Sequence, residues 1–81
     1  MARIILEVRL LQKAEHHDVE VSDEITAHEL VKALNAAYEL GINLTDIGKC
    51  FLRAENPIVL LKGNRRLYEF GVHTGTIINV T

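Results

Sequence analysis

One capped amphipathic helix in a chain of 81 residues constrains the fold more than any other feature of the sequence. Thr26 and Glu29 match a capping box, in which each side chain binds the other residue's backbone N–H group. The apolar residues that follow recur at i, i+3 and i+4 on one face: Ala27, Leu30, Val31, Leu34, Ala37 and Tyr38. Gly41 is the expected left-handed end of this helix. We predict that this face packs against one face of a β-sheet.

Alternating apolar and polar residues predict strands on both sides of the helix. In residues 3–11 the apolar positions Ile4, Leu6, Val8 and Leu10 share one face. Residues 17–21 alternate again, so the polar link Gln12–His16 predicts a β-hairpin. Three further strands are predicted after a loop at residues 41–48: they span residues 49–54, 58–61 and 76–81, with a turn at Asn56-Pro57.

The predicted order of elements is β-β-α-β-β-β, which is the connectivity of the β-grasp. A right-handed crossover from the first hairpin places a later strand parallel to the first. We therefore predict an α+β fold with a mixed sheet of four to five strands and one main helix on one face. We expect residues 1–81 to form a single domain, since the chain is short and carries no interdomain linker.

Composition excludes several broad classes of protein. Apolar residues make up 48% of the chain, which is too many for a disordered segment. Nine basic and eleven acidic residues give a net charge of -2, which argues against nucleic-acid binding. The sequence has no apolar stretch of membrane-spanning length and no signal-peptide layout, so we expect a cytoplasmic protein.

The sequence offers no motif for catalysis, a cofactor or a metal ion. His16 and His17 are adjacent and leave opposite faces of a strand, so they cannot share one ion, and His28 and His73 lie elsewhere. Cys50 is the single cysteine, and its position favours a small buried apolar residue over a nucleophile. We expect a non-enzymatic protein without a cofactor or metal.

The C-terminal third resembles a ubiquitin-like signature. A short strand and the Gly63 turn are followed by Leu-x-x-aromatic-Gly-aliphatic at Leu67–Val72. Val21–Thr26 resembles the strand-to-helix transition of the same fold. Within that superfamily the chain is most similar to the YukD/EsaB type, on the segments Phe51–Ala54, Leu60–Gly63 and Leu67–Val72 and on its bare C-terminus.

The resemblance implies a cytoplasmic accessory or regulatory protein of bacterial type VII (WXG100) secretion. Its implied partner is a cytoplasmic part of the apparatus, such as an ATPase or a membrane component. The chain ends at Val80-Thr81, whereas conjugated ubiquitin-like proteins end in a flexible Gly-Gly tail, so we expect no covalent conjugation. A degenerate β-grasp carrier or small-molecule-binding domain is the alternative, and a β-grasp nucleic-acid module is disfavoured by charge.

Two surfaces are candidates for protein binding, and the oligomeric state is left open. The sheet face away from the helix is expected to carry Ile5, Phe51 and Ile77 beside Arg53. Apolar residues ringed by charge fit a binding patch, and they also fit ordinary cross-strand packing. The second candidate is the basic turn formed by Lys62, Arg65 and Arg66, where a solvated turn is favoured over contact with an acidic partner. Addition of a partner strand at a sheet edge is a third possibility.

Overall fold

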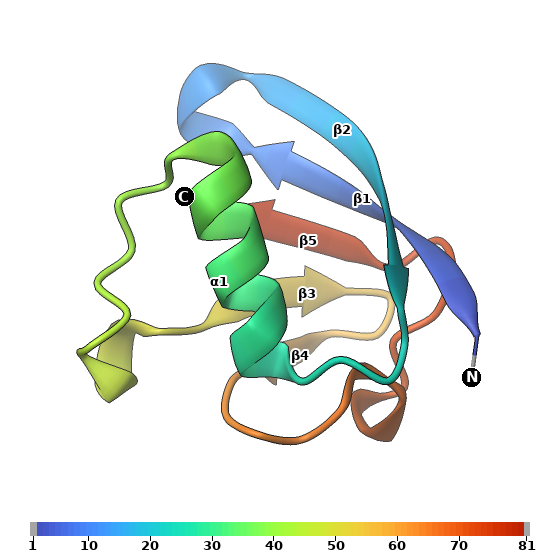
Figure 1. Ribbon diagram of the computed structural model, residues 1–81. Helices are drawn as coiled ribbons and strands as arrows, with labels where there is room; N and C mark the ends of the chain where they lie inside the picture. The colour runs from blue at the N-terminus through green and yellow to red at the C-terminus, as the bar shows by residue number, and fades with distance from the viewer. Residues whose placement is uncertain (1, 81) are drawn as a thin grey trace.

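In the computed structural model, which describes residues 2–80, a five-stranded sheet carries one α-helix across one face (Figure 1). The strands and the helix are β1 (Arg3–Leu10), β2 (Glu15–Ser22), α1 (Ala27–Tyr38), β3 (Leu52–Glu55), β4 (Val59–Leu61) and β5 (Ile77–Val80). Three short 3-10 turns lie between them: η1 (Leu11–Lys13), η2 (Ile47–Lys49) and η3 (Leu67–Phe70). The predicted order of strands and helix is confirmed.

The strands are arranged in the order β2-β1-β5-β3-β4. β1 pairs antiparallel with β2 and parallel with β5, while β3 pairs antiparallel with both β5 and β4. The parallel β1–β5 pair is the one predicted from the crossover rule. The mixed sheet of the β-grasp is therefore confirmed, with the two chain-terminal strands side by side at its centre.

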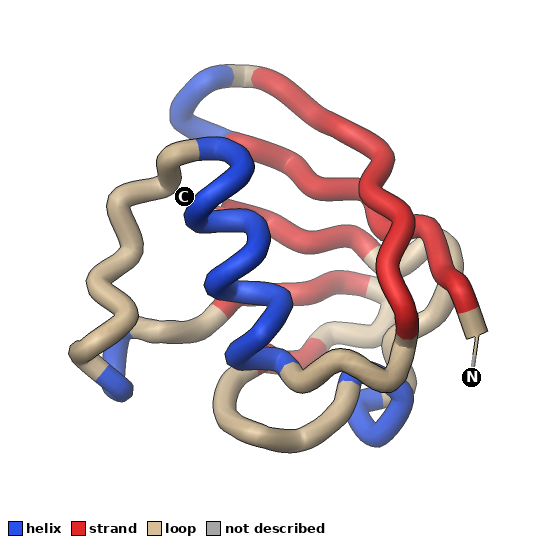
Figure 2. Tube along the Cα trace, viewed as in Figure 1, coloured by secondary structure: helices blue, strands red, loops and turns tan. Residues whose placement is uncertain are grey.

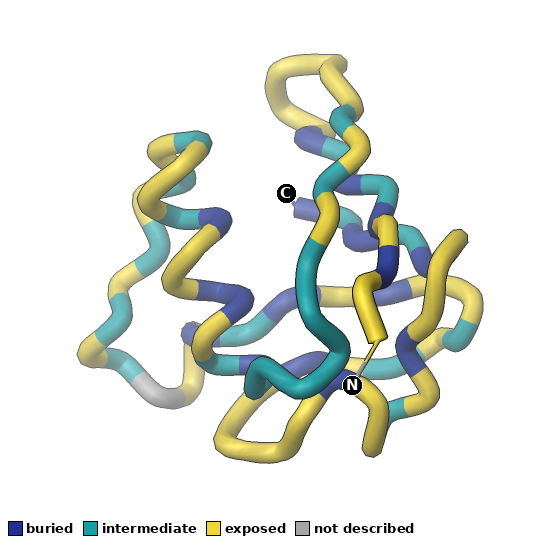
Figure 3. Tube along the Cα trace, turned by 45° about the vertical axis from the view of Figure 1, so that its right-hand side comes forward, coloured by how far each residue is buried: buried dark blue, intermediate teal, exposed yellow. Residues whose placement is uncertain are grey.

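The core lies between α1 and the sheet and is almost entirely aliphatic. Buried residues alternate with more exposed ones along β1, as its sequence pattern predicted (Figure 3). Completely buried side chains come from every part of the chain: Leu6, Val8, Leu30, Val31, Leu61, Leu67 and Ile78. Burying one such side chain is worth about 1.5–3 kcal/mol, so these contacts are the main force that holds the sheet and helix together.

The N-terminus of α1 is fully capped. The Thr26 hydroxyl accepts from Glu29 N–H at 3.1 Å, and the Glu29 carboxylate accepts from Thr26 N–H at 2.9 Å, which confirms the capping box. The next two donors are satisfied from far along the chain: Ala27 N–H donates to Arg65 O at 2.9 Å and His28 N–H to Gly63 O at 3.0 Å. All four N–H groups that a helix start leaves free thus have partners.

The segment after β4 closes against the strand-to-helix connection and passes beneath the first turn of α1 (Figure 2). Thr26 and Arg66 form an isolated antiparallel bridge, Leu67 N–H donates to Ile25 O at 2.9 Å, and Tyr68 N–H donates to Asp23 O at 3.0 Å. Gly63 has a φ of 79°, a left-handed conformation that favours glycine at this turn. These backbone contacts therefore anchor the turn to the start of the helix.

The left-handed end of the helix lies two residues before Gly41, where the sequence pattern placed it. Glu39 adopts the left-handed conformation with a φ of 53°, and its N–H donates to Asn35 O. The Asn35 side chain also binds the backbone of Ile42. Its amide oxygen accepts from Ile42 N–H at 2.9 Å, and its amide nitrogen donates to Ile42 O at 3.2 Å. These bonds turn the chain out of the helix before the glycine. Ala37, expected on the apolar face, lies at its margin and is exposed.

Several strand boundaries also differ from the prediction. The second strand begins at Glu15, inside the predicted link, and the fourth and fifth strands each begin one residue later than predicted, at Val59 and Ile77. The first strand stops at Leu10, and Leu11 begins a 3-10 turn in which its side chain is 53% exposed. The third strand begins at Leu52 rather than at residue 49, because the preceding residues form η2 and its exit. The last strand ends at Val80 within the described chain, and the predicted strand residue Thr81 lies outside the described residues.

The capping carboxylate predicts a pH dependence of stability. The hydrogen bonds from the Thr26 backbone and side chain hold the pKa of Glu29 below its ordinary 4.5. Because the folded pKa is lower than the unfolded one, this stabilisation is complete above pH 4.5 and is lost as the pH falls through the lowered value. We expect Glu29→Gln to melt at a lower temperature than the wild type at pH 6, with the difference shrinking by pH 3.

The matched control is Glu39→Gln at the other end of the same helix, which removes the same charge without the capping contact. Thermal denaturation followed by circular dichroism across this pH range measures both differences. A gap between wild type and Glu29→Gln that does not depend on pH would contradict the prediction.

Candidate protein-interaction surface

The sheet face away from α1, called the outer face below, carries both predicted isoleucines. Ile77 on β5 lies between Glu7 on β1 and Glu55 on β3 in the strand register. Ile5 lies two residues before Glu7 on β1, so the two isoleucines are diagonal neighbours. Ile5 is 46% exposed and Ile77 is half-buried. The structure therefore brings Ile5 and Ile77 together on one face.

Charged side chains form a row beside Ile77. Arg9 pairs with Glu7 through Nε, and its Nη1 lies 4.0 Å from a carboxylate oxygen of Glu55. Arg9 therefore contacts both carboxylates that flank Ile77, and its single positive charge leaves one negative charge in excess among these three side chains. Each exposed pair contributes at most about 1 kcal/mol, so the row matters more for surface charge than for stability.

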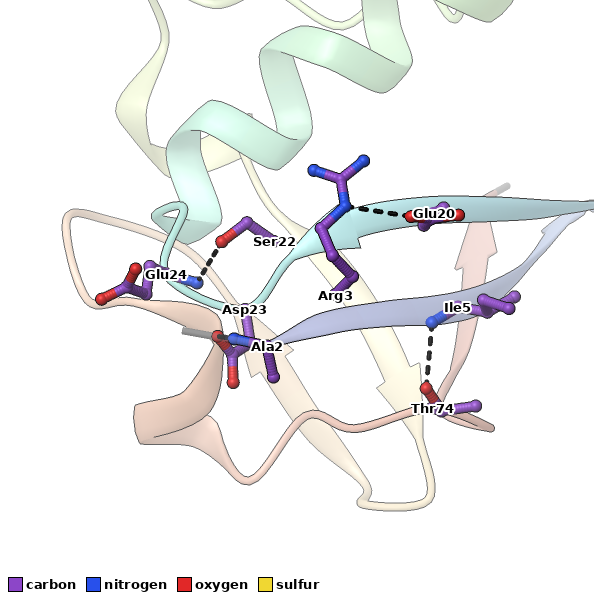
Figure 4. A network of polar contacts seen from close by, with 8 residues as sticks. All are labelled: Ala2, Arg3, Ile5, Glu20, Ser22, Asp23, Glu24 and Thr74. Carbon is purple, nitrogen blue, oxygen red and sulfur yellow. Dashed lines mark hydrogen bonds and ion pairs between the residues drawn. The ribbon is translucent and has the colours of Figure 1, made fainter.

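The backbone of Ile5 is fixed by the loop before β5 (Figure 4). Ile5 N–H donates to the Thr74 hydroxyl at 3.1 Å, and Ile5 O accepts from Gly75 N–H at 3.0 Å. Nearby, Arg3 pairs with Glu20 on β2 at 3.0 Å. The exposed isoleucine therefore stands on a rigid part of the sheet.

Arg53 and Leu60 extend the outer face toward the edge strand β4. Arg53 lies between Asn79 and Leu60 in the register, and it forms no ion pair with any residue in the described range 2–80. Leu60 is 40% exposed and was missed in the sequence, although its alternation with buried Leu61 indicates an outward position. Arg53 is therefore a cation available to a partner beside exposed apolar surface.

Phe51 does not lie in a strand, although the sequence placed it there. It precedes β3, is half-buried, and lines a small hollow of about 150 Å³ with Arg53 and Asn79. Arg53 and Asn79 belong to the outer face, so the hollow places the Phe51 ring at the margin of that face rather than at its centre.

The three cations of the basic turn have different surroundings. Arg66 donates to Glu24 O at 2.7 Å. Arg65 binds Glu69 at 3.4 Å, and its guanidinium lies 5.1 Å from the centre of the Phe70 ring. Lys62 has no hydrogen bond or ion pair to any residue that the structure describes. Two of the three predicted cations therefore hold the turn in place, and Lys62 projects free charge.

Cys50 is buried, as its position predicted, with 4% of its surface exposed. Its sulfur lies 3.4 Å from Nδ1 of His28 in the first turn of α1, a contact that the sequence did not reveal. The two residues are 22 positions apart and share no motif, so only the fold brings them together. They line a pocket of about 600 Å³ beside the basic turn.

Among the described residues, neither a metal-binding cluster nor a membrane-spanning helix is found. In the described range, no group of three or more His, Cys, Asp or Glu side chains is placed to hold a metal ion. Within residues 2–80, no helix has the length and apolar character that crossing a membrane requires.

The fold is that of a ubiquitin-like protein. The structure is similar to the ubiquitin-like domain of an Arabidopsis thaliana protein, with a TM-score of 0.73 and 18% identity over 100% of this chain and 78% of that one. It is also similar to the C-terminal ubiquitin-like domain of mouse tubulin-specific chaperone e (TM-score 0.71, 13% identity, 96% and 84% covered). The UBL domain of Plasmodium falciparum Dsk2 gives a TM-score of 0.64 at 18% identity, with 99% and 100% covered.

Sequence similarity identifies the family more narrowly than the fold does. Residues 5–80 match the family described as WXG100 protein secretion system (Wss), protein YukD. The chain therefore belongs to the YukD family, which confirms the resemblance found in the sequence. Among curated proteins, none matches the sequence significantly.

The row of charges on the outer face predicts how Ile77 tolerates charged substitutions. Ile77→Asp places a third carboxylate between Glu7 and Glu55, whereas Ile77→Lys places a cation between them. Like charges on neighbouring strands destabilise a sheet and opposite charges stabilise it, by about 0.2–1 kcal/mol for each pair. We expect Ile77→Lys to be more stable than Ile77→Asp by about 1 kcal/mol in urea denaturation. Equal midpoints for the two variants would show that these carboxylates do not act on position 77.

Proposed function

We propose that this protein is an accessory component of type VII (WXG100) secretion, which acts as a non-enzymatic protein-interaction module in the cytoplasm. Its partner is a cytoplasmic part of the secretion apparatus, such as an ATPase or a membrane component. Membership of the YukD family is the observation that carries the proposal. The ubiquitin-like fold supports it, because such a small domain presents a rigid sheet face to other proteins.

The outer face is the binding surface in this proposal. α1 covers one side of the sheet, whereas the other side leaves Ile5 and Leu60 exposed among charged residues. Protein interfaces combine an apolar centre with a polar rim, and arginine is enriched in them. Ile5 and Ile77 supply the apolar centre, and Arg53 supplies a cation without an ion pair in the described chain.

The proposal predicts that Ile77→Lys and Ile5→Lys weaken binding to the cytoplasmic parts of a type VII secretion apparatus. Each substitution puts a charge into the apolar centre of the interface, and we expect a loss of at least about tenfold, or 1.4 kcal/mol. Co-purification of tagged protein with each cytoplasmic part identifies the partner, and isothermal titration calorimetry then measures its affinity.

Ile58→Lys is the matched control, because Ile58 precedes β4 in the turn, outside the paired strand residues, and is 91% exposed. We expect it to bind as the wild type does. Affinities that are unchanged in both outer-face variants, with their folds intact, would exclude this face as the interface.

Action without covalent conjugation is a separate part of the proposal and has its own test. Ubiquitin-like proteins that are conjugated, or that carry sulfur, are first adenylated at the C-terminal carboxylate. We expect no adenylated product when the purified protein is incubated with ATP and an E1-like or MoeB-like enzyme, as read by intact-protein mass spectrometry. An added adenylate would favour the carrier alternative over a purely non-covalent role.

A further inference from the structure

The pocket at the first turn of α1, called the cationic pocket, lies between three segments distant in sequence. Its lining comes from α1, from the loop that leads into β3 and from the turn after β4: His28, Leu44, Gly48, Cys50, Lys62, Gly63, Asn64 and Arg65. Its volume of about 600 Å³ is within the range of ligand-binding pockets. It is separate from the outer face, because none of the outer-face residues lines it.

The charge of the lining is one-sided. Lys62 and Arg65 are cations, His28 adds a titratable ring, and no carboxylate lines the pocket. The acidic residues nearby are already engaged: Glu29 accepts from Thr26 N–H at 2.9 Å, and Asp46 accepts from Gly48 N–H at 3.1 Å. A negatively charged group in the pocket would therefore meet positive charge without a competing acid from the lining.

The backbone at the start of α1 does not contribute to binding a negatively charged group in the pocket. His28 N–H and Ala27 N–H are bonded to Gly63 O and Arg65 O, so the helix offers no free N–H group to an anion. Side chains must bind the charge instead. Lys62 is the strongest candidate, since it has no partner among the described residues, whereas Arg65 shares its guanidinium with Glu69 at 3.4 Å.

The pocket also has an apolar part and an open rim. Leu44 is half-buried and Cys50 is buried, with its sulfur against the His28 ring at 3.4 Å. Most other lining residues are solvent-exposed. A small ligand would stay largely in water in such an open hollow, whereas a peptide segment can cross it and place one side chain inside.

We infer that the cationic pocket binds an acidic segment of a protein partner, with a carboxylate at Lys62 and Arg65 and an adjacent aliphatic side chain against Leu44 and Cys50. This inference rests on the proposed function as a protein-interaction module, and it adds a second binding site with its own chemistry. Charge complementarity selects the occupant, because the lining is cationic around an apolar floor.

The test uses a blocked hexapeptide of alternating glutamate and leucine, titrated into the ¹⁵N-labelled full chain. We expect the amide signals of Gly48, Gly63 and Asn64 to shift in a saturable way. A peptide with glutamine in place of glutamate should bind at least about tenfold more weakly, a difference of 1.4 kcal/mol. Equal affinity for the two peptides, or shifts confined to the outer face, would overturn the inference.

Lys62→Glu should weaken binding of the acidic peptide by at least about tenfold, since it replaces an attraction with a repulsion. Lys13→Glu is the matched control: it makes the same change of charge at η1, where Lys13 donates a hydrogen bond to Tyr38 O at 3.2 Å and forms no ion pair with a described residue. We expect Lys13→Glu to bind the peptide within twofold of the wild type. Undiminished binding by Lys62→Glu would also overturn the inference.

The two proposals can fail separately. A partner that binds through Ile77 while the peptide leaves the pocket signals unchanged would contradict the cationic pocket alone. If the peptide shifts the pocket signals in a saturable way but no cytoplasmic part of a secretion apparatus binds the protein, only the proposed function is contradicted.

Discussion

The hydrogen bonds from Ala27 and His28 N–H to the carbonyls of Arg65 and Gly63 join the helix to a turn more than thirty residues further along the chain. Without them, two donors at the start of α1 would need water, and the turn would lose two of the backbone contacts that hold it beneath the helix. The same contact places Leu67 in the core and sets one wall of the cationic pocket. Core packing, turn and pocket therefore all depend on how one helix end is satisfied.

The outer face follows from a different constraint, which is the parallel pairing of β1 with β5. This pairing puts Glu7 beside Ile77 and Arg9 beside Asn79, and β3 adds Glu55 and Arg53 on the other side. Ile5 and Ile77 are consequently diagonal neighbours, and the charged side chains of β3 separate them from Leu60 on the edge strand. Such a face exposes little continuous apolar surface, and its isoleucines still offer an apolar centre to a partner with complementary charge.

Local sequence patterns predict the strands and the helix, whereas contacts between distant residues determine where the helix ends and which side chains meet. Alternation in β1 and the capping box of α1 depend on neighbouring residues, so both could be read from the sequence. The helix end could not, because Asn35 ends it through bonds to Ile42 before Gly41 is reached. Ile5 and Ile77 were placed on one face from alternation and strand order alone. The contact of Cys50 with His28 joins two segments 22 residues apart, and no spacing in the sequence indicates that they meet.

The two proposed sites differ in the chemistry that they offer, and this bears on how such a small domain could act. The outer face presents isoleucines among charges of both signs, which suits a partner surface of mixed character. The cationic pocket presents unbalanced positive charge around an apolar floor, which suits an acidic segment. Since the sites share no residue and lie on different parts of the domain, one partner bound at the sheet does not occupy the pocket. A domain with both sites can connect two protein segments without forming a covalent bond to either.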